Sequence, residues 1–72
     1  MREELETKVG LYIDDFELVD DIKSRGFEVQ TENLVDTTIR SMYELIVLDG
    51  EEEVVSCVIN SELTGTMIEE VR

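Results

Sequence analysis

The chain has 72 residues, of which 19 are acidic and 6 are basic, so its formal net charge at pH 7 is −13. Charge repulsion of this size opposes compaction, and it excludes direct binding to nucleic acid or to an anionic membrane as the expected function. Histidine is absent, which removes the commonest general base and zinc ligand, and no nucleotide-binding or metal-binding motif is present. We therefore expect no enzyme activity, no cofactor and no metal site.

The composition is that of a folded domain and not of a disordered acidic tail. Hydrophobic residues make up 42% of the chain, and they fall in periodic runs rich in Val, Ile and Leu. The length allows a single domain over residues 1–72, with a small core that buries only ~60% of the unfolded surface. Because Cys57 is the only cysteine, the chain has no internal disulfide, which favours a reducing compartment. We expect Cys57 to be a small buried hydrophobic residue. Because no apolar run approaches the ~20 residues of a membrane span and no signal peptide is evident, we expect a cytoplasmic location.

Two interpretations of residues 1–13 remain open. Val9–Ile13 is a β-prone run that would form a strand leading into the next element. Alternatively, one longer helix would begin near Arg2, because apolar residues follow a 4-3-4-3 spacing at Leu5, Val9, Tyr12, Phe16 and Val19. The capping pattern at Asp14 favours the strand, and the unbroken apolar stripe favours the helix.

An amphipathic helix is predicted over Asp15–Arg25. Asp14 is a suitable N-cap, and Glu17 three residues later completes a capping box. Gly26 is placed to end the helix in the left-handed conformation. The apolar face consists of Phe16 and Val19, with Leu18 and Ile22 beside them.

A β-hairpin is the second clear prediction. Tyr43–Leu48 and Val54–Ile59 are rich in β-branched and other apolar residues, and Asp49-Gly50 between them is a strong turn signal. Glu51, Glu52 and Glu53 lie at the turn and at the start of the second strand. The apolar content of both strands predicts that they are central in the sheet or covered on both faces.

The remaining segments complete an α+β fold. Phe27–Thr31 alternates with period two and predicts a third strand, and Thr37–Met42 extends the first hairpin strand backwards. Glu62–Val71 predicts a short C-terminal helix, because Leu63, Met67 and Val71 are four residues apart. We expect a small three-stranded antiparallel meander, with a possible fourth N-terminal strand, packed against the Asp15–Arg25 helix. The predicted core is Phe16, Val19, Ile22, Phe27, Val29, Leu45, Val47, Val55, Val58, Ile59 and Ile68.

A doubly wound arrangement is the alternative fold. The run that ends in Asp14-Asp15 and the run Tyr43–Asp49 resemble the first and third strands of response-regulator receiver domains. That resemblance implies a Mg²⁺ and phosphoryl site at Asp14, Asp15 and Asp49. Two features depart from the family: Asn33–Met42 is β-branched where a helix is required, and too few residues follow Asp49 to complete the fold.

The acidic residues are the candidate binding groups. The negative charge exceeds the magnitude of ~2–8 that keeps a small domain soluble. The alternative explanation is that the charge serves only solubility. The acids on the two best-defined elements are the ones we expect to contact a basic partner protein. These partner-binding candidates are Asp14, Asp15, Asp20, Asp21, Glu51, Glu52 and Glu53.

In charge, size and element pattern, Asp15–Arg72 resembles small acidic phage-encoded inhibitors of nucleic-acid enzymes, such as some anti-CRISPR proteins and other DNA mimics. No family-specific motif is matched. The resemblance implies a protein that occupies the basic nucleic-acid-binding surface of a target protein, in competition with DNA or RNA. The alternative is a regulatory or assembly module that acts through homo-oligomerisation, as a homodimer, without mimicry.

Overall fold

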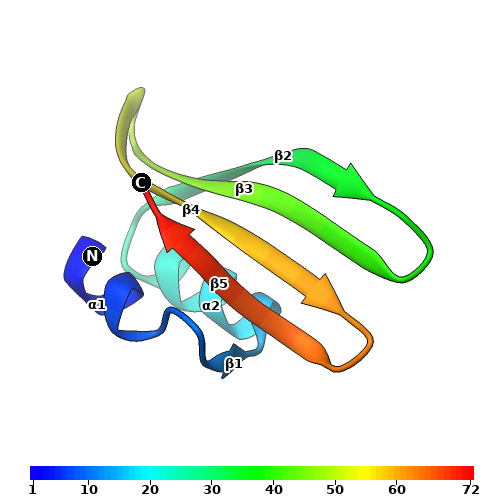
Figure 1. Cartoon of the computed structure of the whole chain (residues 1–72). Coiled ribbons are helices and arrows are strands. Elements are labelled where there is room, and N and C mark those ends of the chain that lie inside the picture. Colours follow the sequence, from blue (N-terminus) through cyan, green and yellow to red (C-terminus); the bar gives the residue numbers. More distant parts are fainter.

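The computed structural model describes residues 1–72, in which two short helices pack on one face of a five-stranded sheet (Figure 1). The strand order is β1-β5-β4-β3-β2, and all neighbouring strands are antiparallel. In chain order the elements are α1 (Arg2–Thr7), β1 (Tyr12–Ile13), α2 (Asp15–Ser24), β2 (Glu28–Asp36), β3 (Arg40–Asp49), β4 (Glu52–Glu62) and β5 (Gly65–Val71).

The predicted α+β arrangement of a three-stranded meander with a C-terminal helix is wrong. The meander contains β2, β3, β4 and β5, and β1 adds a fifth strand beside β5. The segment predicted as a helix is a strand, in which Ile68 lies opposite Ile59 of β4. The spacing of Leu63, Met67 and Val71 is misleading because the three residues share no face. Leu63 lies in the β4–β5 turn, and a β-bulge opposite Val58 puts Met67 and Val71 on opposite faces of β5.

The predicted hairpin is confirmed as β3 and β4, which are joined at Gly50 and lie inside the sheet. Leu45 lies opposite Cys57, and Val47 lies opposite Val55. Alternation along the strands directs these four residues to the same face, towards the helices. The predicted strand after α2 is also present and is longer than expected, since β2 continues to Asp36.

Neither interpretation of the first thirteen residues is right as a whole. A helix forms, but it ends at Thr7, and Gly10 has a φ of +79°, so a single helix from Arg2 onwards is excluded. A strand also forms, but only at Tyr12–Ile13. The intervening chain lies along β5, where the Gly10 N–H donates to the Ile68 carbonyl at 3.1 Å.

The antiparallel sheet rules out the receiver-type arrangement, which needs a parallel sheet and three converging aspartates. Asp15 contacts Tyr43 early in β3, whereas Asp49 is at the other end of that strand, next to the β3–β4 turn. The two groups of acids are therefore separated by most of the length of β3.

The predicted α2 helix, its Asp14 N-cap and its end at Gly26 are confirmed, but no hydrogen bond joins the Asp14 N–H to the Glu17 carboxylate, so the predicted capping box is incomplete. The Asp14 carboxylate accepts hydrogen bonds from the backbone N–H groups of Phe16 and Glu17, at 3.0 and 3.3 Å. Gly26 follows the helix with a φ of +91°, the left-handed region that favours glycine. The helix turns Leu18 and Ile22 into the core, whereas Phe16 is 80% exposed, so its assignment to the core is wrong.

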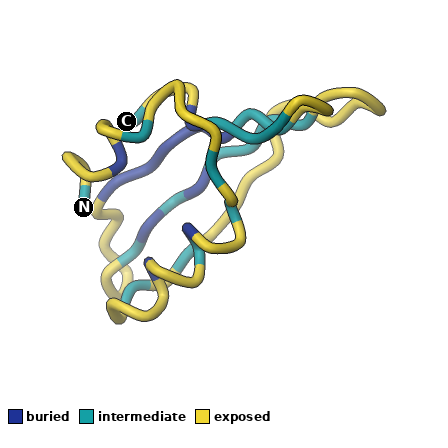
Figure 2. The backbone as a smooth tube through the Cα atoms, turned by 90° about the horizontal axis from the view of Figure 1, so that it is seen from below, coloured by how far each residue is buried: buried dark blue, intermediate teal, exposed yellow.

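The core lies between the helices and the inward face of the sheet, as the buried segments in Figure 2 show. Leu5 and Leu18 belong to it and were not in the predicted core, whereas Cys57 is buried as expected. Val58 is buried as predicted, but it is absent from this cluster because it faces the opposite side of the sheet. The fully buried core residues are Leu5, Ile22, Leu45, Val47, Val55, Cys57, Ile59 and Ile68.

Candidate binding surface

The helices cover only one face of the sheet, and the other face is open (Figure 1). Strand alternation and the pairing register assign side chains to this open face. Its only basic residues are Arg40 and Arg72, and its apolar residues include Ile46, Leu48 and Val58. Its acidic residues are Glu28, Glu32, Glu44, Glu53, Glu62, Glu69 and Glu70.

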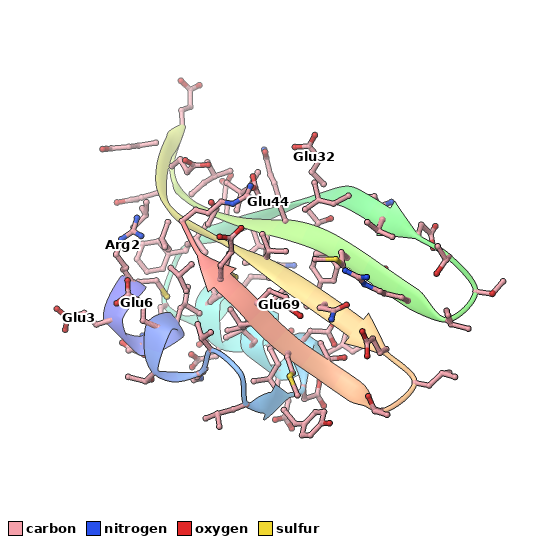
Figure 3. The ribbon with its side chains drawn as sticks, in the orientation of Figure 1. Arg2, Glu3, Glu6, Glu32, Glu44 and Glu69 are labelled. Carbon is pink, nitrogen blue, oxygen red and sulfur yellow. The ribbon has the colours of Figure 1, made fainter.

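Three of these glutamates share one row across the strands. Glu32 lies opposite Glu44, Glu44 lies opposite Val58, and Val58 lies opposite Glu70. Figure 3 shows Glu32 and Glu44 beside each other on β2 and β3. Like charges directly opposite each other on adjacent strands are destabilising, so this row needs a neutralising group or a cationic partner.

Arg72 neutralises one end of the row. Its guanidinium bonds to the Glu44 carboxylate at 2.6 Å and to the Glu70 carboxylate at 3.0 Å, and so bridges β3 and β5 across Val58. The backbone N–H of Arg72 also donates to the Ser56 carbonyl at 2.7 Å. These bonds raise the pKa of Arg72 above its usual value, through Glu70 first and Glu44 second. Glu32 has no such partner.

We expect Arg72→Ala to lower the free energy of unfolding more than removal of an unpaired arginine does, because it leaves the Glu44 carboxylate, whose side chain is only 15% exposed, without its cation. Arg2→Ala, which removes the same charge from α1, is the matched control and should change stability by less than about 0.5 kcal/mol. Urea titrations of both variants measure the difference. Equal losses in the two variants would mean that the bridge contributes nothing.

The predicted helical acids mostly have partners within the chain. Asp14 caps α2, Asp15 accepts a hydrogen bond from the Tyr43 hydroxyl at 2.8 Å, and Asp21 pairs with Arg25 at 3.1 Å. Arg25 also binds the Glu4 carboxylate at 2.8 Å, which ties α1 to α2 and holds the pKa of Glu4 below its usual value. Of the four predicted acids on this helix, only Asp20 has no hydrogen bond or ion pair.

The Tyr43–Asp15 contact predicts sensitivity to alkali. Burial first, and the neighbouring carboxylate second, raise the pKa of Tyr43, so the folded protein keeps the phenol neutral where the unfolded chain ionises near pH 10. Burial also raises the pKa of Cys57 to about 11. For groups with a raised pKa, stability is complete below the unfolded pKa and is lost as the pH rises through the folded one. Unfolding titrations should therefore show a decline that begins near pH 9 and steepens above pH 10, and Tyr43→Phe should remove the steeper part. An identical profile for that variant would contradict this assignment.

The three predicted hairpin glutamates divide between two sides of the sheet. Glu53 lies opposite Leu48 and belongs to the open face, whereas Glu52 lies opposite Asp49 and points to the other side, and Glu51 is in the turn. The turn projects beyond the end of the sheet, away from α2 (Figure 1). The structure does not bring the seven predicted acids together on one surface.

The acids that do share a surface were mostly missed by the sequence analysis. Glu28 and Glu32 are four residues apart in β2. Residues an even number of positions apart share one face of a strand, so this spacing is a usable signal. Glu62, Glu69 and Glu70 were placed on a helix that does not exist, which hid their position on the open face. Glu69 now lies beside Asn60, whose side-chain N–H donates to its carboxylate at 2.8 Å.

A groove of about 430 Å³ runs between α2 and the β2–β3 pair. From the helix, Phe16 and Val19 line it, and from the strands Thr31, Asn33 and Tyr43 do so. Asp15, Asp20 and Lys23 add charged groups at its margins. The groove therefore combines an exposed aromatic ring with carboxylates, beside the outer strand of the sheet.

Three further findings concern the molecule as a whole. No group of three or more acidic or cysteine side chains is arranged to hold a metal ion. No helix has the length and apolar character needed to cross a membrane. Comparison of the chain with protein-family models, with curated proteins and with solved structures finds no match.

Proposed function

We propose that this protein is a small acidic inhibitor that occupies the basic nucleic-acid-binding surface of a target protein, and that the open face of the sheet makes the contact. One observation carries the proposal: glutamates from β2, β3, β4 and β5 lie on a face that no helix covers. The single buried thiol, Cys57, fits action in a reducing cytoplasm.

The mechanism is competition between carboxylates and phosphates for the same lysine and arginine side chains. Adjacent strands are about 4.8 Å apart, so glutamates in a cross-strand row present closely spaced charges on a rigid support. Attraction between opposite charges raises the rate of association with the target. Added salt screens the charges and lowers that rate again. The contribution of each exposed glutamate is small, and the affinity comes from their sum over the surface.

Glu28, Glu32 and Glu53 are the best residues for a test, because they lie on the open face and form no ion pair. The matched set on the helices is Glu3, Glu6 and Glu17, which are exposed, form no ion pair and do not line the groove at Phe16. Figure 3 shows Glu3 and Glu6 on α1, away from Glu32 and Glu44. Changing either set to the corresponding amides removes the same charge, so only the location differs.

The experiment begins with capture of binding proteins on the immobilised chain and continues with the purified partner. We expect duplex DNA or RNA to displace the partner, and binding to weaken steeply from about 50 to about 200 mM NaCl. The open-face amide variant should bind about tenfold more weakly and with a shallower salt dependence, while the helix variant binds like wild type. A partner that nucleic acid cannot displace, or an affinity that is indifferent to salt, would overturn the proposal. Loss of binding only in the helix variant would instead place the contact on α1 and α2.

A further inference from the structure

Strand β2 has a free edge, which is regular over 28–33 and is interrupted by a β-bulge at Leu34. It is the outermost strand, spans nine residues from Glu28 to Asp36, and only Val29 is even partly buried. The opposite edge of the sheet is covered by β1 and by the chain around Gly10. Figure 2 shows the far end of the β2–β3 hairpin extending, exposed, beyond the rest of the molecule. An edge of this kind presents unpaired backbone N–H and C=O groups that can bind another strand.

The groove beside this edge supplies a place for apolar side chains. Phe16, at 80% exposure, projects from α2 next to Thr31 and Asn33 of β2, whose side chains face the same side of the sheet. A strand added to β2 would place every second side chain on this side, over Val19 and the Phe16 ring. The ring would gain the contacts that it lacks within the chain.

The opposite side of the same edge is acidic. Glu28 and Glu32 point to the open face. They would therefore lie beside the side chains that a strand added to β2 places on that face. A second copy of this chain is a poor occupant, because antiparallel pairing of β2 with itself about Gln30 would set Glu28 of each copy opposite Glu32 of the other. The edge is thus complementary to a strand that is basic on one face and apolar on the other.

We propose that β2 receives an extended segment of the partner protein as an additional antiparallel strand, in which lysine or arginine alternates with apolar residues. The basic side chains lie over Glu28 and Glu32, and the apolar ones fill the groove at Phe16. This inference rests on the proposed function for the basic character of the partner. It adds the form of the segment that is bound and the place where it binds.

The test uses a short capped peptide in which lysine alternates with valine, and a control peptide of the same composition with lysines and valines in separate blocks. Amide chemical shifts of the labelled protein should move saturably at residues 28–33, and exchange of the β2 amides should slow on binding. The block peptide has the same charge but cannot satisfy both faces at once, so we expect it to bind about tenfold more weakly.

Phe16→Ala should weaken binding of the alternating peptide by about tenfold, as loss of an aromatic anchor does. Leu63→Ala is its control, because Leu63 is an equally exposed apolar residue, at 87% exposure, in the β4–β5 turn. That variant should bind like wild type. The Glu28→Gln/Glu32→Gln variant should bind more weakly and with less dependence on salt.

Equal affinity for the two peptides, or shifts spread over acids of both helices, would overturn the inference, because either result indicates non-specific charge attraction. Self-association of the free protein with protected β2 amides would overturn it as well, since the edge would then serve a second copy. Peptide binding at β2 together with a partner that DNA cannot displace would overturn the proposed function alone. Displacement by DNA without peptide binding at β2 would overturn this inference alone.

Discussion

Replacement of Ile22 by alanine should lower the free energy of unfolding by about 3 kcal/mol, the middle of the range for deleting a large aliphatic side chain from a core. Ile22 is fully buried, and with Leu18 it anchors α2 to the sheet. A domain of this size is stable by roughly 0.05–0.15 kcal/mol per residue, or about 4–11 kcal/mol in total. The variant should therefore lose a large share of its stability, which a urea titration followed by circular dichroism measures.

Phe16→Ala is the matched control on the same helix. Its ring is larger than the Ile22 side chain, but it is 80% exposed, so we expect a change of less than about 0.5 kcal/mol. The sequence pattern places both residues in the core and predicts losses in both variants. A loss in Phe16→Ala as large as that in Ile22→Ala would show that α2 is rotated relative to the arrangement described above.

Gly65→Ala should lower the free energy of unfolding by about 2 kcal/mol, for two reasons that act together. The residue has a φ of +144°, a backbone conformation that residues with a side chain rarely adopt. An added Cβ would also lie 2.5 Å from Cδ1 of the Tyr12 ring, which covers this glycine from the neighbouring strand. The substitution forces the ring away from the sheet. This movement weakens the β1–β5 pairing of Tyr12 with Met67.

A double-mutant cycle with Tyr12→Ala separates the two contributions. Removing the ring relieves the clash but leaves the backbone strain, so the double variant should lose less stability than the sum of the single variants, by about 1 kcal/mol. Strict additivity would mean that the ring does not lie on Gly65 in solution. Measurement of all four proteins under one set of conditions provides the cycle.

The elements with local signals at both ends were predictable. Asp14 and Gly26 mark the limits of α2, and Asp49-Gly50 marks the turn between β3 and β4, because each position needs a particular side chain or a particular φ. The face of α2 that packs inwards was less predictable. Phe16, Leu18, Val19 and Ile22 form a wide apolar arc, and the packing partner decides which edge of the arc is buried.

The C-terminal strand was not predictable, because a β-bulge breaks the alternation of inward and outward residues that marks a strand. Regular alternation fails at Glu69 and Glu70, where two residues of β5 lie opposite one residue of β4. Leu63, which seemed to begin the helical stripe, is in a turn and 87% exposed. The length of β1 likewise depends on pairing with Thr66 and Met67, which are distant in sequence.

Long-range strand pairing also decides which acids share a surface. Acids clustered in the sequence, such as Asp14 and Asp15, are used for capping and for a hydrogen bond to Tyr43. Acids scattered in the sequence, such as Glu32 and Glu70, are brought onto one face by strand pairing. Because the register is a long-range property, counting acids along the chain could not locate this surface.

Carboxyl labelling of the free protein and of its complex with the purified partner tests the central claim most directly. A carbodiimide couples an amine to accessible carboxylates, and mass spectrometry reports the extent at each residue. We expect binding to protect Glu28, Glu32 and Glu53 on the open face, while Glu3, Glu6 and Glu17 on the helices react as in the free protein. Protection of the helical acids, with unchanged labelling of the open face, would contradict the account.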